Sequence, residues 1–133
     1  TNGDAIRDVA YVKVANTQRA LRDLAASHTA ADLDTLRALQ RQAEEAPDTA
    51  ALAQALFRYH RGVTFLSGNT ITPLLFNAFM QVNLEFWSGY IRSVGREESL
   101  RTLARFTDLI AAGQGDRAAQ LLDDGLRRFV TTL

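Results

Sequence analysis

The sequence predicts an all-α fold, an antiparallel bundle of about six helices with a central apolar helix. Apolar residues recur at intervals of three, four or seven positions along most of the chain, which is the spacing of helices with one buried face. No segment alternates apolar and polar residues as a half-buried strand would. Both prolines lie where helices are expected to begin or end.

The first two helices are predicted over residues 4–27 and from Thr29 to just before Pro47. The first has one apolar stripe along its length. The Thr29 hydroxyl can cap the second, and Asp32 lies in its first turn, where the helix dipole favours an acid. Pro47 disfavours helical geometry in the residue before it and so ends the second helix.

The next two helices contain most of the aromatic residues. Asp48 is predicted to cap the third helix, which ends at Ser-Gly-Asn, residues 67–69. A single fourth helix is predicted from about Pro73 to Val94. Because it is apolar nearly all round, it belongs in the centre of a bundle or at a large interface. Its apolar residues are Leu74, Leu75, Phe76, Phe79, Met80, Val82, Leu84, Phe86, Trp87, Tyr90 and Ile91.

The last two helices are amphipathic. One is predicted from about Glu97 to Ala112, after Gly95, and the other begins at Asp116 and continues to the C-terminus. Short connections make consecutive helices antiparallel neighbours. The whole chain, residues 1–133, is therefore expected to be one domain.

The composition limits the function. Fifteen basic residues balance fifteen acidic ones, so no net charge draws this chain to nucleic acid or to an anionic membrane. The absence of cysteine excludes disulfides and thiolate metal sites. No apolar run reaches the length of about 18 residues that spans a bilayer, and no secretory leader is recognisable, so a cytoplasmic location is expected.

Two polar residues interrupt apolar helix faces. His60 lies between Leu56 and Val63, and a lone histidine in such a place is more often a hydrogen-bonded core residue than a ligand. A metal would need two or three further donors. Asn83 lies one turn from Trp87 among aromatic residues. It needs an internal partner or a ligand, because an unpartnered buried amide costs about 1–3 kcal/mol. The aromatic residues around Asn83 form either part of the hydrophobic core or the wall of an apolar pocket.

No catalytic arrangement is recognisable. The sequence has no phosphate-binding glycine loop, nucleophile elbow or His-Glu-x-x-His motif, and no pair of carboxylates on one apolar face. Arg58 and Arg61 could clamp an anion, although a solvated face is the usual reason for such a pair. An enzyme is therefore not expected. A structural dimerisation module without a ligand and a small metal-dependent enzyme are the alternatives.

Two segments carry a family resemblance, Tyr-His-Arg-Gly at residues 59–62 and Phe-Leu-Ser-Gly-Asn at residues 65–69. They resemble the effector-binding domain of the GntR family of bacterial transcription regulators, in its FadR-like subgroup. In that subgroup Ser-Gly-Asn begins seven residues after a motif histidine, as Ser67 follows His60. The resemblance implies a helical bundle that binds a metabolite in its interior and forms a homodimer. DNA is then read only by a winged-helix domain outside this chain.

The chain departs from this family at the metal site. Most members hold a metal with an aspartate four residues before the motif histidine and with two histidines on the last two helices. Here Leu56 occupies the aspartate position, and Arg105 and Arg127 fall near the other two. Only His60 is retained, so neither a metal nor another cofactor is expected.

The resemblance suggests an acyl-CoA or an organic acid as the effector, bound among the third to sixth helices. Arg105 and Arg127 would anchor its anionic group in place of the metal. His60 would donate or accept a hydrogen bond, and the region from Phe79 through Asn83 to Trp87 would enclose the apolar part. The ligand would stabilise one relative placement of two DNA-binding heads.

Overall fold

The computed structural model describes the backbone of residues 2–130 and the side chains of residues 4, 8 and 11–129. The all-α prediction is confirmed, since the described residues form helices and no strand. The helices are α1 (Asn2–Ala26), α2 (Ala30–Glu44), α3 (Thr49–Leu66), α4 (Thr72–Ala78), α5 (Met80–Val94), α6 (Arg96–Ala111) and α7 (Gly115–Val130).

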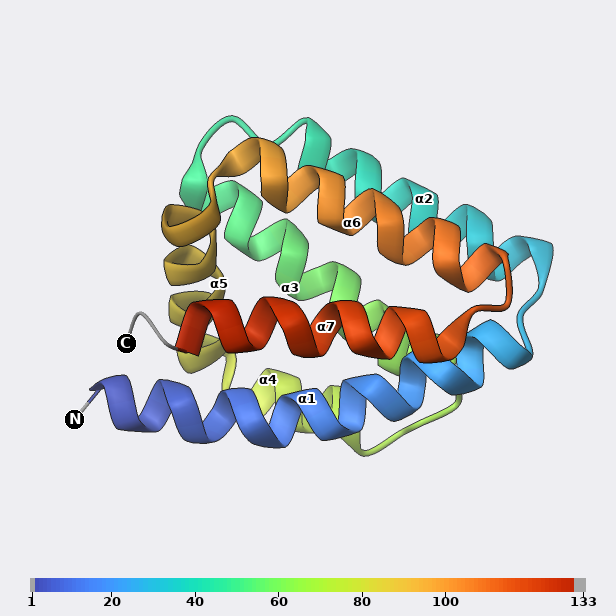
Figure 1. Ribbon diagram of the computed structural model, residues 1–133, viewed down its shortest axis with the longest axis horizontal. Helices are drawn as coiled ribbons and strands as arrows, with labels where there is room; N and C mark the ends of the chain where they lie inside the picture. Colours follow the sequence, from blue (N-terminus) through green and yellow to red (C-terminus); the bar gives the residue numbers. More distant parts are fainter. Residues whose placement is uncertain (1, 131–133) are drawn as a thin grey trace.

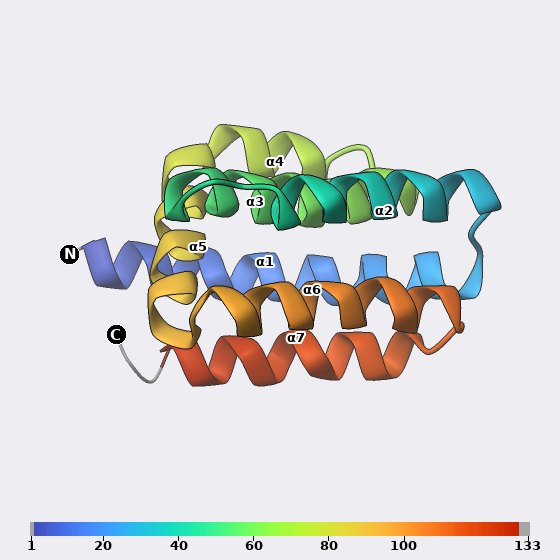
Figure 2. The same cartoon turned by 90° about the horizontal axis from the view of Figure 1, so that it is seen from above.

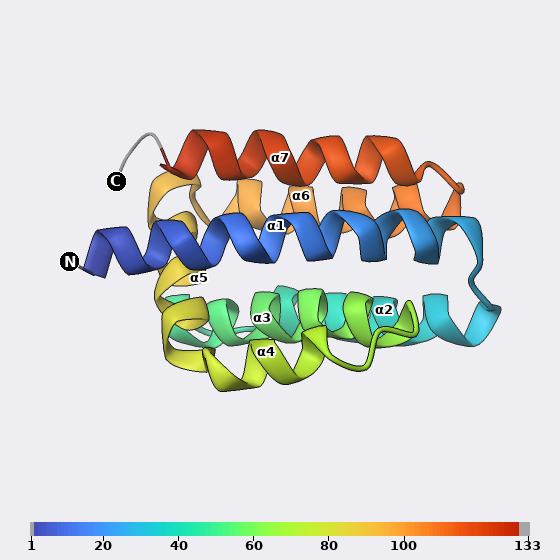
Figure 3. The ribbon, with the colours of Figure 1, turned by 90° about the horizontal axis from the view of Figure 1, so that it is seen from below.

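The helices form two layers joined at one end. One layer contains α2, α3 and α4, the other contains α1, α6 and α7, and α5 crosses between them (Figures 2 and 3). Apart from α5, consecutive helices run in opposite directions along the long axis (Figure 1). Helices α1 and α7 lie side by side although they are far apart in the sequence. The cavity described below lies between the two layers.

Local signals set the helix boundaries largely as predicted. The Thr29 hydroxyl accepts a hydrogen bond from the Asp32 amide at 3.1 Å, and the Asp32 carboxylate accepts one from the Thr29 amide at 3.0 Å. This reciprocal pair satisfies N–H groups that α2 leaves free at its start. Asp48 caps α3 with a single hydrogen bond, which its carboxylate accepts from the Ala51 amide at 2.8 Å.

The Ser-Gly-Asn segment ends α3 and starts α4. Gly68 has a φ of 88°, a left-handed conformation that glycine adopts without a steric penalty. The Asn69 side-chain oxygen then accepts hydrogen bonds from the Ile71 and Thr72 amides, both at 3.0 Å. This segment therefore has a structural reason to be Ser-Gly-Asn that involves no ligand.

The prediction of a single helix from Pro73 to Val94 is wrong. The chain breaks at Phe79, where φ is −111° and ψ is 33°, and α5 turns away from α4 across the end of the bundle (Figure 3). Asn83 stabilises the break, because its side-chain amide donates to the carbonyls of Phe79 at 3.0 Å and Phe76 at 3.4 Å. The Phe76 carbonyl lies in the last turn of α4, where helical hydrogen bonds stop, and the Phe79 carbonyl also accepts from the Asn83 backbone amide at 3.0 Å. Both segments are apolar, so hydrophobic spacing gave no sign of the break.

Helices α4 and α5 differ in burial. The inner face of α5 contributes Phe86, Trp87, Tyr90 and Ile91 to the core, each less than 9% exposed. In contrast, α4 and the break leave several large apolar side chains in contact with solvent. These are Ile71 (66% exposed), Leu74 (65%), Leu75 (42%), Phe79 (50%) and Met80 (39%), which together we call the apolar face.

Gly115 explains the close contact between α1 and α7. A Cβ atom at this position would lie 2.7 Å from the Arg22 Cα atom, which is closer than two non-bonded carbon atoms can approach. The Asp116 carboxylate accepts from Arg22 Nε at 2.9 Å, so the pair also holds the start of α7 against α1. No helix in the described part of the chain is long and apolar enough to cross a membrane.

Candidate functional site

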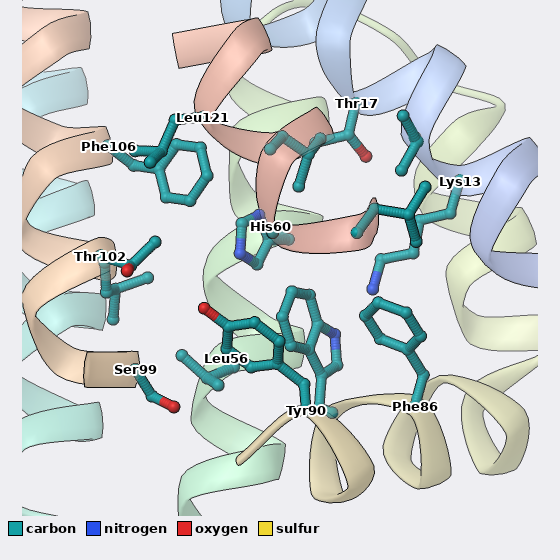
Figure 4. Close-up of a pocket in the computed structure, with 16 residues that line it drawn as sticks. Lys13, Thr17, Leu56, His60, Phe86, Tyr90, Ser99, Thr102, Phe106 and Leu121 are labelled. Carbon is teal, nitrogen blue, oxygen red and sulfur yellow. The ribbon is translucent and has the colours of Figure 1, made fainter. Parts of the chain in front are cut away.

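A small cavity lies in the centre of the bundle, lined by residues of α1, α3, α5, α6 and α7 (Figure 4). Its volume is about 30 Å³, enough for one or two groups the size of a water molecule. Its polar groups come from α1, α3, α5 and α6, and its apolar wall from all five helices. The lining residues are Lys13, Val14, Thr17, Leu56, His60, Phe86, Trp87, Tyr90, Ser99, Thr102, Leu103, Phe106, Leu121, Leu122, Gly125 and Leu126.

Lys13 carries its amine from α1 into this apolar surrounding. The Nζ atom lies 3.8 Å from the centre of the Trp87 ring and 4.5 Å from that of Phe86. Within the described part of the chain, Nζ has no hydrogen-bond partner, and no salt bridge to it is found. Burial therefore lowers the pKa of Lys13 well below its ordinary value, because a charged amine loses its hydration there. Burial thereby shifts the balance of this amine from its charged toward its neutral form.

His60 faces the same cavity from α3. Its ring stacks on Trp87 with the centroids 4.7 Å apart and the planes 7° from parallel, and Phe106 contacts it edge-on at 5.3 Å. Its Nδ1 atom has no partner among the described residues. Burial, and secondly the charge of Lys13, lower the pKa of His60 well below its ordinary value, so the imidazole is neutral.

Two further polar atoms around the cavity lack partners among the described residues, Thr17 Oγ1 and Trp87 Nε1. Buried polar groups are nearly always hydrogen-bonded, and each unpartnered one costs about 1–3 kcal/mol. Four such groups gathered around one cavity indicate a site that is completed from outside the chain. Lysine, threonine and tryptophan supply N–H or O–H donors, and no carboxylate is present among the lining residues. The cavity therefore suits an acceptor or an anion.

The sequence matches the FCD domain over residues 17–128. The match covers most of the chain, including all of α3, α5 and α6 and most of α7 among the helices that line the cavity. The chain belongs to the FCD family. This domain is the C-terminal effector-binding domain of GntR-family regulators, and in that family it is a ligand-sensing regulatory domain rather than a catalytic one. The comparison with curated proteins gave no match.

This FCD domain does not offer the donors of a metal centre. The cavity has one imidazole, with Leu56 beside it in place of the carboxylate that the resemblance leads one to expect. In the part of the chain that the structure describes, no three His, Cys, Asp or Glu residues are grouped to hold an ion. Amine, hydroxyl and indole donors do not replace them, so the residues present do not fit a metal.

The structure brings together only some of the residues predicted from sequence. His60 and Trp87 both line the cavity. Arg105 and Arg127 do not reach it: each lies on the outer face of its helix, and Arg127, with its side chain 77% exposed, pairs with Asp123 at 2.8 Å. Their inward-facing neighbours are apolar, because adjacent helix positions differ by about 100°. The predicted arginine anchors are therefore absent from the cavity.

The remaining candidates lie elsewhere on the FCD domain. The Asn83 amide bridges the helix break described above, and its side-chain oxygen has no partner among the described residues. This residue lines a separate groove next to the cavity. Arg58 and Arg61 line a broad surface groove of about 790 Å³, where Arg61 donates to the Asn77 side-chain oxygen at 2.7 Å.

The groove beside the cavity has a volume of about 230 Å³. The surface that its lining residues expose to the groove is almost entirely apolar. It opens between α1 and the α4–α5 break. Lys13 lines both the groove and the cavity, so its side chain lies in the wall that the two share. The other lining residues of the groove are Asp8, Val12, Asn16, Thr72, Leu75, Phe76, Phe79 and Asn83.

Reasoning from the sequence missed Lys13, although a signal was present. It is the only lysine in the sequence. It lies four and eight residues before Thr17 and Leu21, on the stripe of α1 that the structure buries. A lone lysine on the apolar stripe of a predicted helix is unusual, because lysine is rarely buried without a counter-charge.

Proposed function

We propose that this FCD domain senses a small organic anion whose charged group enters the cavity beside Lys13. The observation that carries the proposal is a set of four polar groups, mostly donors, that have no partner in the described part of the chain. They surround a cavity whose described lining contains no carboxylate. Lys13 replaces the arginines expected from the sequence as the anchor. A charge-assisted hydrogen bond from its amine is the strongest contact that the site offers.

The binding step couples the anion to a proton. In the free domain burial lowers the pKa of the amine, because its charge is not hydrated there. An anion beside it stabilises the protonated form, so binding takes up a proton from solvent. The Trp87 indole N–H, the Thr17 hydroxyl and His60 then complete the hydrogen bonds around the anionic group. The aromatic wall excludes water and strengthens each of these interactions.

The groove supports an apolar portion of the ligand. A chain that leaves the cavity past Lys13 reaches a wall formed by Val12, Leu75, Phe76 and Phe79. An acid with an aliphatic or aromatic tail therefore uses both spaces. The small cavity volume favours a simple carboxylate head over a bulky one, and acyl-CoA is the competing candidate.

Ligand-induced stabilisation of the full regulator tests this proposal. Linear monocarboxylates, dicarboxylates and acyl-CoAs are compared by thermal shift; a ligand at 100 times its Kd stabilises by about 2.7 kcal/mol. Lys13→Met is expected to abolish the shift, whereas the matched surface variant Arg127→Met should keep it. A shift that survives Lys13→Met and disappears with Arg127→Met would contradict the anchor. If no acid or acyl-CoA has an effect, the domain is the ligand-free dimerisation module.

The same proposal includes a homodimer formed through the apolar face. Large exposed apolar patches on soluble proteins mark interaction surfaces, and five large apolar side chains are exposed here on α4 and the break. A second copy would cover this face and part of the groove mouth. Ligand binding would then change the relative orientation of the two subunits. This change would also reorient two winged-helix domains outside this chain, which would bind DNA in the cytoplasm.

Analytical ultracentrifugation tests the dimer. Leu74→Glu places a charge on the apolar face and is expected to raise the dissociation constant at least about 30-fold, equivalent to about 2 kcal/mol. Gln81→Glu adds the same charge at an exposed polar position of α5 and should have little effect. A dimer that tolerates Leu74→Glu does not use this face.

A further inference from the structure

Lys13 has a second chemical capacity that anion binding does not use. Its amine is unpartnered among the described residues and is surrounded by aromatic rings. Burial holds its pKa well below that of a solvent-exposed lysine. A larger share of this amine therefore carries a free electron pair at neutral pH, and lysines desolvated in this way are the ones that form Schiff bases.

We propose that Lys13 is a covalent capture site, which binds small aldehydes and ketones reversibly as imines. The carbonyl compound enters through the apolar groove, whose wall Lys13 shares with the cavity. The reacting carbon then lies in the cavity, and any apolar substituent remains in the groove. This inference goes beyond effector sensing, because a neutral carbonyl compound needs no anion anchor.

The chemistry balances without an oxidant or a reductant. The amine lone pair forms a bond to the carbonyl carbon while the C=O π electrons move to oxygen. A proton transfers from nitrogen to that oxygen and gives a carbinolamine. Protonation of its hydroxyl lets water leave as the nitrogen lone pair forms the C=N bond of an iminium ion. Loss of the nitrogen proton then gives the imine and returns the proton that was added. The net reaction is amine plus carbonyl compound to imine plus water, and hydrolysis reverses it.

The cavity supplies what these proton transfers need. Neutral His60 lines the same space and can accept and return a proton through its unpartnered ring nitrogen. The Thr17 hydroxyl, also unpartnered among the described residues, can hydrogen-bond the developing oxygen. Neither residue forms a bond to carbon, so their part is to move protons and to orient the adduct.

Reductive trapping provides the test. The full regulator carrying Arg19→Lys is treated with propanal and cyanoborohydride, which reduces an imine to a stable secondary amine, and modified sites are mapped by mass spectrometry. Position 19 has a side chain 83% exposed and supplies a reference lysine on the same helix. The propanal concentration is set so that this reference reaches half-modification.

At pH 7, Lys13 is expected to be modified at least about tenfold faster than the reference, since an exposed lysine with a pKa of about 10.4 is almost fully protonated. Between pH 7 and 9 the ratio of the Lys13 rate to the reference rate should fall, because the free-amine fraction of the exposed reference still rises about 100-fold over this range and that of Lys13 rises less. In urea the two rates should become equal. Modification of Lys13 at or below the reference rate in the native protein would overturn the proposal.

The outcome is separable from that of anion sensing. Carboxylates are tested by thermal shift on the same protein sample, where no covalent adduct forms. If Lys13 resists trapping while carboxylates still stabilise the domain, covalent capture fails and anion sensing stands. If Lys13 is trapped and no acid stabilises the domain, covalent capture stands and anion sensing fails.

Discussion

The cavity and the apolar face are opposite departures from ordinary globular packing. Around the cavity, polar groups of Lys13, Thr17, His60 and Trp87 are buried without partners among the residues that the structure describes. On α4 and the break, large apolar groups are exposed. Both arrangements reduce stability, the first by about 1–3 kcal/mol per group and the second through lost hydrophobic burial. In the functions proposed above, a small polar ligand completes the first region and an apolar surface of a second copy covers the other.

Truncation of leucine should separate the two regions most clearly. Leu56 is 2% exposed in the cavity wall, and Leu56→Ala is expected to lower the free energy of unfolding by about 2–5 kcal/mol. Leu74 is 65% exposed, so Leu74→Ala should change the stability of the monomer by less than about 0.5 kcal/mol. Urea unfolding at low protein concentration measures both. Equal losses would show that the apolar face is part of the core.

Removal of the buried amine should raise the free energy of unfolding, whereas truncation of a core leucine lowers it. Lys13→Met keeps the chain length and eliminates an unpartnered polar group, so it should stabilise the ligand-free domain by about 1–3 kcal/mol. Lys13→Arg retains an obligatory charge and should destabilise it. Thermal unfolding measures the two variants. A destabilising Lys13→Met would mean that the amine already has a favourable partner.

The same amine gives stability a pH dependence. Its pKa is lowered in the folded state, so the unfolded chain binds more protons above the folded pKa and stability rises with pH up to about 10.4. The slope contributed by Lys13 is at most about 1.4 kcal/mol per pH unit. His60, also with a lowered pKa, adds a loss of stability as pH falls below about 6.5. The advantage of Lys13→Met over the wild type should therefore shrink as pH rises, which unfolding curves from pH 7 to 10 would reveal.

Local chemistry in the sequence was enough to predict most of the fold. Thr29 with Asp32, and Asp48, cap helices through hydrogen bonds within three residues, so their effect is visible in sequence. The break at Phe79 depends on the Asn83 side chain reaching back four and seven residues. The segments before and after Phe79 are both apolar, so the hydrophobic pattern of the sequence does not reveal such a break.

The candidate site was only partly predictable for a different reason. His60 and Trp87 were found because they follow from local motifs and aromatic spacing. Arg105 and Arg127 were placed by analogy with a metal site, and a rotation of about 100° between adjacent helix positions points them to solvent. Lys13 lies on the first helix, whose position beside α3 and α5 depends on the packing of the whole bundle.

Proton uptake during ligand binding tests the central claim most directly. Calorimetric titration of a stabilising carboxylate, in two buffers of different ionisation enthalpy at pH 8, gives the number of protons bound with each ligand. We expect a net uptake of protons on binding to the wild type, up to a limit of about one per anion. We expect no binding in Lys13→Met. Unaltered binding in Lys13→Met with no proton uptake in either protein would contradict the claim.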